Sequence, residues 1–100
     1  MNAPTQLDAS ARIEQIRLRL QYGLNPTALD IVDESHKHAG HAGARDGRGH
    51  FRVRIVAAAF SGQPLIRRHQ RVYAALGDLM QTDIHALALD TRAPDDAGVS

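Results

Sequence analysis

The stretch His50-Phe51-Arg52-Val53-Arg54-Ile55-Val56 decides the fold of this 100-residue chain. Its apolar residues alternate with arginines, which is the pattern of a β-strand with one buried face. We therefore predict a strand over residues 50–56 that covers a core with Phe51, Val53 and Ile55 and exposes Arg52 and Arg54.

A second strand is predicted upstream, over residues 28–33, where Leu29 and Ile31 alternate with Asp30 and Val32. The segment between the two strands, residues 34–49, is polar and glycine-rich. Loops longer than about 12–15 residues are usually functional or disordered. We expect the two strands to pair antiparallel across this long loop, with the carboxylates at 33 and 34 ending the first strand.

Two amphipathic helices flank this pair of strands. The first is expected from Asp8 or Ser10, either of which can cap it, to about residue 22, with Gly23 as its stop. Its apolar stripe is Ile13, Ile16 and Leu20, and its surface residues are Arg12, Glu14, Arg17 and Arg19. The second is expected over residues 65–80. Its apolar face carries Leu65, His69, Val72, Leu76 and Leu79, and its opposite face carries Arg67, Gln70, Arg71 and Ala74.

The last strand is expected over residues 84–90, after an ambiguous stretch at 57–60 and the second helix. The order helix, strand, strand, helix, strand predicts a two-layer α+β domain. A helical crossover before the last strand permits parallel pairing at one edge of the sheet. We place the domain at residues 8–94, between flexible tails at 1–7 and 95–100.

The composition narrows the classes of function. Hydrophobic residues make up 43% of the chain, the formal charge is +1 and cysteine is absent. These values are typical of a folded soluble domain and exclude thiol catalysis by this chain. No stretch reaches the roughly 20 apolar residues of a membrane span, and residues 1–7 do not resemble a secretory signal. We expect a cytoplasmic protein without membrane contact, and the absence of nucleotide-binding or metalloprotease motifs argues against an enzyme.

Histidines are the strongest chemical signal, since the chain has six of them. His36, His38 and His41 lie in the glycine-rich loop, and His85 lies at the start of the last strand. Imidazole is the commonest protein metal ligand. Isolated loop histidines are usually only solvated, but the predicted topology brings this loop close to His85. Two histidines form half of a four-ligand site, so a metal held by this chain alone is not favoured.

A basic cluster is predicted on the second helix, from Arg67, Arg68 and Arg71 around His69. We expect His69, on the apolar face, to be partly buried and hydrogen-bonded to backbone. The arginines form either an ordinary solvated face or a surface that contacts phosphate or an acidic partner.

Several short motifs occur together in a specific order and spacing. They are Asp33-Glu34-Ser35, the histidines at 38 and 41, His50-Phe51-Arg52-Val53, Phe60-Ser61-Gly62, Arg68-His69-Gln70-Arg71-Val72-Tyr73 and Ile84-His85-Ala86-Leu87. Together they resemble the BolA family, over about residues 13–94. The resemblance implies a class II KH-like domain of order αββ(α)αβ, with a three-stranded mixed sheet covered by helices on one face. It also implies a helical turn at about residues 57–60.

The resemblance implies a non-enzymatic adaptor. BolA-like proteins form a heterodimer with a monothiol glutaredoxin and share a bridging 2Fe–2S cluster, for which the glutaredoxin and glutathione supply thiolates. The implied ligands from this chain are His85 and a loop histidine, with His38 the best match and His36 and His41 as alternatives. Because imidazole must be neutral to bind metal, cluster sharing is expected to weaken as the pH falls through about 6.5.

The main alternative is a DNA-binding transcriptional regulator that uses the basic helix around Arg67 and Arg71. The Gly-x-x-Gly clamp of KH domains is missing, since the corresponding break reads Ser61-Gly62-Gln63-Pro64. A scaffold that docks glutaredoxin without holding iron is a third reading. Whether the chain also forms a homodimer stays open.

Overall fold

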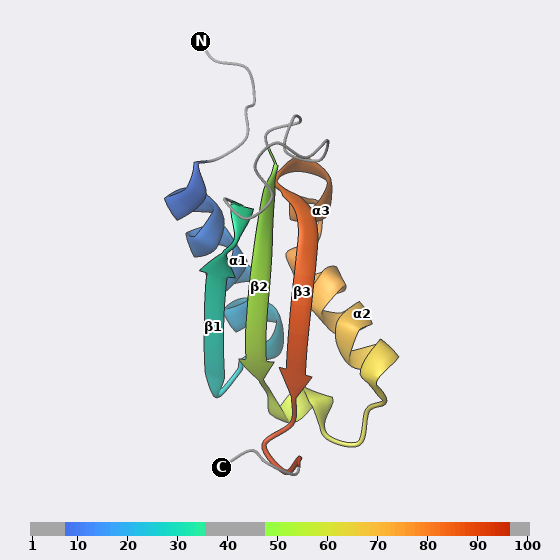
Figure 1. Cartoon of the computed structure of the whole chain (residues 1–100). Helices are drawn as coiled ribbons and strands as arrows, with labels where there is room; N and C mark the ends of the chain where they lie inside the picture. The colour runs from blue at the N-terminus through green and yellow to red at the C-terminus, as the bar shows by residue number, and fades with distance from the viewer. Residues whose placement is uncertain (1–7, 36–47, 97–100) are drawn as a thin grey trace.

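The computed structural model describes residues 8–35 and 48–96, and the histidines at 36, 38 and 41 lie outside these ranges. Within them the elements follow the predicted order, as Figure 1 shows. Their bounds are α1 Ala9–Leu24, β1 Ala28–Asp33, β2 Gly49–Val56, the 3-10 turn η3 Ala58–Phe60, α2 Leu65–Leu76, α3 Leu79–Thr82 and β3 Ile84–Arg92. No described helix has the length and apolar character needed to cross a membrane.

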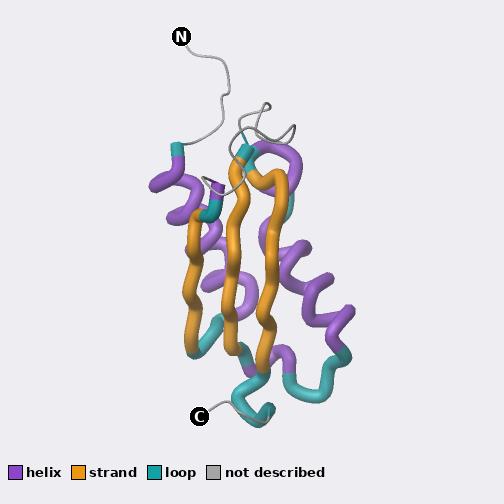
Figure 2. Tube along the Cα trace, in the orientation of Figure 1, coloured by secondary structure: helices purple, strands orange, loops and turns teal. Residues whose placement is uncertain are grey.

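The sheet is mixed, with the order β1-β2-β3. Strand β1 pairs antiparallel with β2, and β3 pairs parallel with β2 on the other side. Both pairings confirm the sequence prediction. The helices lie against one face of the sheet, and the other face is left open (Figure 2). The α+β fold with helices on one side of three strands is therefore confirmed, as is the helical turn at 58–60.

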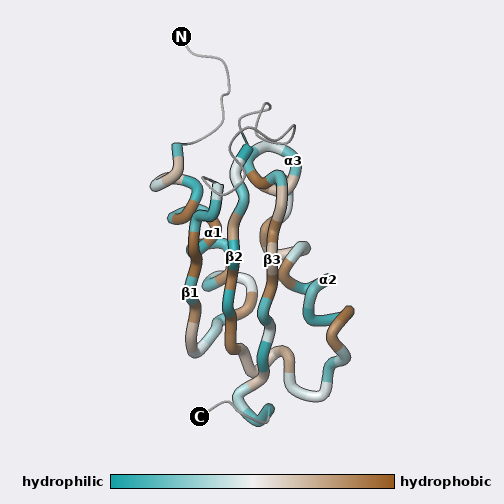
Figure 3. Tube along the Cα trace, in the orientation of Figure 1, coloured by the Kyte–Doolittle hydropathy of each residue, from teal (hydrophilic) through white to brown (hydrophobic). Residues whose placement is uncertain are grey.

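The core lies between the sheet and the helices. Phe51, Val53 and Ile55 are buried, while Arg52 and Arg54 are exposed on the open face. This alternation is visible along β2 in Figure 3. Leu29 and Ile31 of β1 pack against this core. The remaining core residues come from the helices, from η3, from β3 and from the residues that directly follow β2 and β3; they are Ile16, Leu20, Leu24, Ala57, Phe60, Val72, Leu76, Leu79, Ile84 and Ala93.

Helix α1 begins as predicted and ends later. Asp8 is its N-cap and accepts a hydrogen bond from the Ala11 N–H at 2.8 Å. The helix continues through Gly23 to Leu24, because Leu24 is buried in the core. Asn25 then takes a left-handed conformation, with φ of 48°, and its N–H donates to the Gln21 carbonyl. The prediction that Gly23 stops the helix was wrong.

The predicted helix over 65–80 is two helices. Gly77 takes a positive φ of 57° and ends α2, and α3 then carries Leu79 into the core. Arg19 of α1 stabilises this break by donating to the Leu76 carbonyl at 2.7 Å and by pairing with Asp78 at 2.9 Å.

Leu65, which the pattern placed on the buried stripe, is 61% exposed, because it lies in the first turn of α2, beyond the packed part of the helix.

Strand β3 is two residues longer than predicted, since Thr91 and Arg92 pair with Ile55 and Val56. The predicted C-terminal tail also requires correction. Asp95 accepts a hydrogen bond from the Ser61 hydroxyl at 2.9 Å, and Asp96 forms an ion pair with Arg68. The packed structure therefore reaches at least to Asp96.

Candidate functional site

A β-bulge places His85 at the start of β3. Gly49 of β2 pairs with Ile84, and the next residue, His50, pairs with Ala86. His85 is therefore the extra residue of the bulge, and it is exposed. Bulges change the direction of a side chain and are common next to functional sites. The bulge gives the predicted ligand an orientation that regular pairing would not.

Short backbone contacts tie the three strands together at this end of the sheet. The Gly49 N–H donates to the Asp83 carbonyl at 2.9 Å, and the Glu34 N–H donates to the His50 carbonyl at 2.7 Å. The His50 N–H donates to the Ser35 hydroxyl at 3.0 Å. These bonds fix the end of β1 and the starts of β2 and β3 relative to one another.

Residues 33 and 34 end β1, as the sequence predicts. The Asp33 carboxylate accepts a hydrogen bond from the Ser35 N–H at 2.8 Å, which turns the chain after the strand. Glu34 pairs with Arg52 at 3.1 Å. Both carboxylates are thus part of the strand end.

Among the described residues, the side chains of His50 and Arg48 lie beside the ring of His85. The ring of His50 lies with its centroid 5.2 Å away at an interplanar angle of 44°. Arg48 Nη2 lies 3.2 Å from His85 Nδ1. Neither residue was predicted to belong to the site, although His50 was predicted to begin a strand. Their proximity depends on the register of β2 against β3.

A hollow of about 300 Å³ opens beside the histidine pair on the same end of the sheet. It is lined by both polar and apolar side chains, namely Glu34, His50, Phe51, Ala86, Leu87 and Ala88. This end of the sheet therefore offers imidazole, a carboxylate and a concave surface together.

The loop that contains His36, His38 and His41 leaves the described structure after Ser35 and rejoins it at Arg48. Ser35 bonds to the backbone of His50, and Arg48 contacts His85, so both ends of the loop lie at the candidate site. Within residues 8–35 and 48–96 no group of three or more potential ligands gathers to hold a metal.

The predicted basic cluster divides in two. Arg67 and Arg71 are exposed and line a hollow of about 210 Å³ with Gln63, Gln70 and Ala74, which confirms the predicted polar face. Arg68 lies elsewhere, with its side chain only 13% exposed. Consecutive helical residues are about 100° apart around the axis, so Arg68 faces the end of β3 instead of this hollow.

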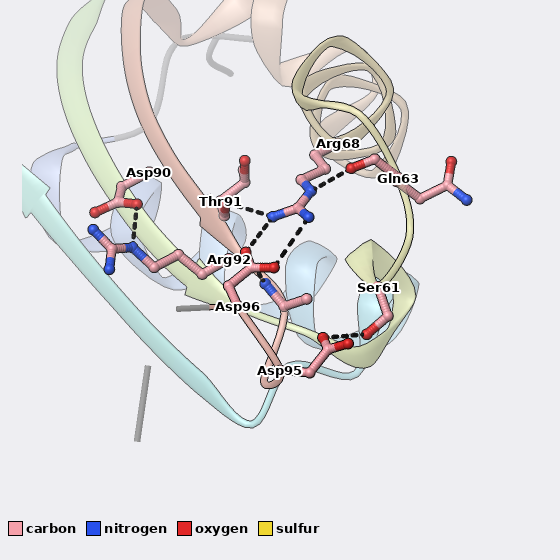
Figure 4. A network of polar contacts seen from close by, with 9 residues as sticks. Ser61, Gln63, Arg68, Asp90, Thr91, Arg92, Asp95 and Asp96 are labelled. Carbon is pink, nitrogen blue, oxygen red and sulfur yellow. Dashed lines mark hydrogen bonds and ion pairs between the residues drawn. The ribbon is translucent and has the colours of Figure 1, made fainter. Parts of the chain in front are cut away.

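Arg68 is the centre of a polar network shown in Figure 4. It donates to the Gln63 carbonyl at 2.8 Å and the Thr91 carbonyl at 3.2 Å, and both its terminal nitrogens bond to Asp96. Its hydrogen bond to Asp96 lowers the pKa of that carboxyl from its ordinary value of 3.8 and raises the pKa of Arg68. Arg68 therefore has a structural role and is not part of the exposed basic surface.

His69 is half-buried on α2, as predicted, but its expected hydrogen bond to backbone is not formed at Nε2. This nitrogen is buried and has no hydrogen-bond partner in the described structure. His69 is not among the residues that line the hollow with Arg67 and Arg71.

A buried ion pair joins α1 to Asp83, the residue just before β3. Arg12 Nε of α1 lies 3.1 Å from Asp83 Oδ2, and the two side chains are 10% and 6% exposed. Arg12 was predicted to lie on the surface of the helix, which was wrong. Its burial has no sequence signal, because Asp83 is 71 residues away and meets it only in the folded chain.

The fold and site together define a small α+β domain with an exposed strand-end histidine and no cysteine. The family model described as BolA-like protein matches residues 20–96. The chain belongs to the BolA-like family.

Three relatives illustrate this membership. The chain is 40% identical over 85 residues to SufE-like protein 1, chloroplastic/mitochondrial, of Arabidopsis thaliana, covering 80% of this chain and 23% of that protein. It is 37% identical over 78 residues to the DNA-binding transcriptional regulator BolA of Escherichia coli, covering 78% and 71%. The structure of BolA1 from Arabidopsis thaliana matches with a TM-score of 0.73 at 35% identity, covering 86% and 95%. The chain thus spans about a quarter of the first relative.

Proposed function

We propose that this chain is a non-enzymatic adaptor that binds a monothiol glutaredoxin and shares a bridging 2Fe–2S cluster with it. The observation that carries the proposal is the exposed His85, held on a bulge at the strand end where the histidine-containing loop begins and ends. Membership of the BolA-like family supports the same reading.

His85 and one loop histidine, with His38 first and His36 and His41 as alternatives, are the residues of this chain that would hold the cluster. The donor set fits, because the chain supplies imidazoles and lacks thiols, so the thiolates come from the partner and glutathione. A cluster bound in this way supplies electron storage at a higher potential than one with four thiolates, as histidine ligation does in Rieske centres. The bulge and the hydrogen bonds around His50 position the imidazole of His85.

The test is to mix the chain with a 2Fe–2S-loaded monothiol glutaredoxin and record visible absorption and circular dichroism. We expect a changed cluster spectrum that reverts to that of glutaredoxin alone in His85→Ala. His38→Ala, His36→Ala and His41→Ala identify the loop ligand, and His50→Ala tests the neighbouring ring. His69→Leu removes a histidine from a different element and is the matched control, so it should keep the changed spectrum. An unchanged spectrum with no complex formed would refute the adaptor proposal.

A second function, binding to the phosphate backbone of DNA, is supported by the exposed surface of α2. Arg67 and Arg71 lie one turn apart around the same hollow, and neither forms an ion pair with a described residue. A regulator is also among the relatives. Arg68 is not part of this surface, because it forms an ion pair with Asp96.

The salt dependence of duplex binding, measured by fluorescence anisotropy, tests this second function. Each phosphate contact contributes roughly 0.9 to the slope of log K against log salt. Arg67→Gln with Arg71→Gln should therefore reduce the slope by about 2, whereas Arg17→Gln on α1 should not. Equal slopes for the double variant and the unmodified chain would exclude this surface from DNA binding.

A further inference from the structure

Arg48 approaches one of the two ring nitrogens of His85. Its Nη2 lies 3.2 Å from Nδ1 of His85. A guanidinium has only donors and is never deprotonated in proteins. Nδ1 must therefore be the acceptor, and in the neutral ring the proton lies on Nε2, since a neutral imidazole has one donor and one acceptor nitrogen.

The contact between Arg48 and Nδ1 is incompatible with a metal bond at the same nitrogen. Metal binds an imidazole through a nitrogen that has a lone pair, and in this tautomer that nitrogen is Nδ1. For His85 to bind iron, the Arg48 guanidinium has to leave Nδ1, or the proton has to move from Nε2 to Nδ1. Either change ends the hydrogen bond seen here.

Arg48 is held close to His85 from its other side. Its Nη1 is within 3.4 Å of the Met80 carbonyl and 3.5 Å of the Gln81 carbonyl, both in α3. These two acceptors keep the guanidinium beside the bulge through Nη1, while Nη2 reaches the ring. The arginine is also the residue at which the chain rejoins the described structure after the histidine loop.

We propose that Arg48 is a positioning residue that caps Nδ1 of His85 in the metal-free chain, sets its tautomer and competes with the metal for it. The inference rests on the proposed ligation by His85. Its consequence is that binding of the cluster and release of Arg48 from His85 occur together.

The first experiment measures the tautomer of His85 in the isolated, metal-free chain by 15N NMR of the imidazole nitrogens. The spectra are recorded at alkaline pH. We expect an unprotonated Nδ1 and a protonated Nε2 in the unmodified chain, with a loss of this preference in Arg48→Met. Arg52→Met, which removes an exposed arginine from β2, should leave the signals unchanged. A His85 ring protonated at Nδ1, or signals that Arg48→Met does not alter, would overturn the cap.

The second experiment measures the affinity for 2Fe–2S-loaded monothiol glutaredoxin from the change in its visible spectrum. Loss of a competing hydrogen bond should tighten cluster sharing by about threefold to tenfold in Arg48→Met. Equal or weaker affinity would overturn the competition. Where Arg48→Met lowers the melting temperature, Arg48→Ala provides an independent variant.

The two experiments separate the inference from the function on which it rests. If the ring is protonated at Nε2 but the cluster spectrum does not change with the unmodified chain or any variant, cluster sharing is refuted, and with it the competition. If the ring is protonated at Nδ1 while the cluster spectrum changes in a manner that depends on His85, only the cap is refuted.

Discussion

The ion pair between Arg12 and Asp83 should be one of the largest single-residue contributions to the stability of this domain. Both side chains are at most 10% exposed, and Nε and Oδ2 are 3.1 Å apart. Removing one partner of a buried pair leaves an uncompensated charge and costs about 3–5 kcal/mol. Because 1 kcal/mol shifts the melting temperature of a domain of this size by about 4–8 °C, Arg12→Met should lower it by about 12 °C or more.

The pair also holds the candidate site. Asp83 precedes His85 by two residues, and its carbonyl accepts the hydrogen bond from Gly49 N–H that sets the register at the bulge. Loss of Arg12 should therefore disturb the His85 ring signals as well as the stability. A local effect of this kind distinguishes the pair from a contact that only adds to the overall stability.

The assay is a double-mutant cycle with Arg12→Met, Asp83→Asn and the double variant, unfolded by urea and followed by circular dichroism. The double variant should lose less free energy of unfolding than the two single variants lose in sum, by at least about 1 kcal/mol, because the two residues contact each other. Arg17→Met is the control, since its pair with Glu14 is exposed and worth about 0–1 kcal/mol. A cost below about 1 kcal/mol for Arg12→Met, with additive effects in the double variant, would refute the reasoning.

Three further predictions concern other parts of the domain. His69→Leu should leave the melting temperature unchanged or raise it, because it removes a buried Nε2 that has no hydrogen-bond partner in the described structure; a fall of several degrees in a thermal scan would contradict this. Gly49→Ala should destabilise the domain by about 1–3 kcal/mol in urea titration, because its Cβ would lie 2.6 Å from Cε2 of Phe51, and a neutral effect would show that the ring shifts freely. The hydrogen bond from Arg68 is the first cause of the lowered pKa of Asp96. The ionised Asp96 therefore stabilises the folded domain at neutral pH, and this contribution is lost as the pH falls below about 3.8. Asp96→Asn should accordingly reduce the fall in melting temperature between pH 5 and pH 2.5, and an identical acid profile would argue against the pair.

Patterns within one element were predicted well from the sequence. The alternation in residues 50–56 identified β2 and its buried face, and the helical periodicity identified the exposed set Arg67, Gln70, Arg71 and Ala74. Asp8 was one of the two predicted caps, with Ser10 as the alternative, because a cap's hydrogen bond joins residues only three positions apart. Such features depend on local geometry, which the order of residues determines directly.

The tertiary structure decided the features that join distant residues. The break at Gly77 depends on Arg19, which stabilises it from another helix, and the burial of Arg12 depends on Asp83. The burial of Arg68 likewise depends on its contact with Asp96, which is 28 residues away and meets it only in the folded chain.

The same division applies to the candidate site. The sequence alone predicted His85 as a ligand, through its motif, but the neighbours of His85 follow from the bulge between β2 and β3. A shift of one residue in that register would remove the contacts with His50 and Arg48, because alternate residues of a strand face opposite sides of a sheet. Which residues are present was determined by the sequence, and which of them act together was decided by the packing of the strands.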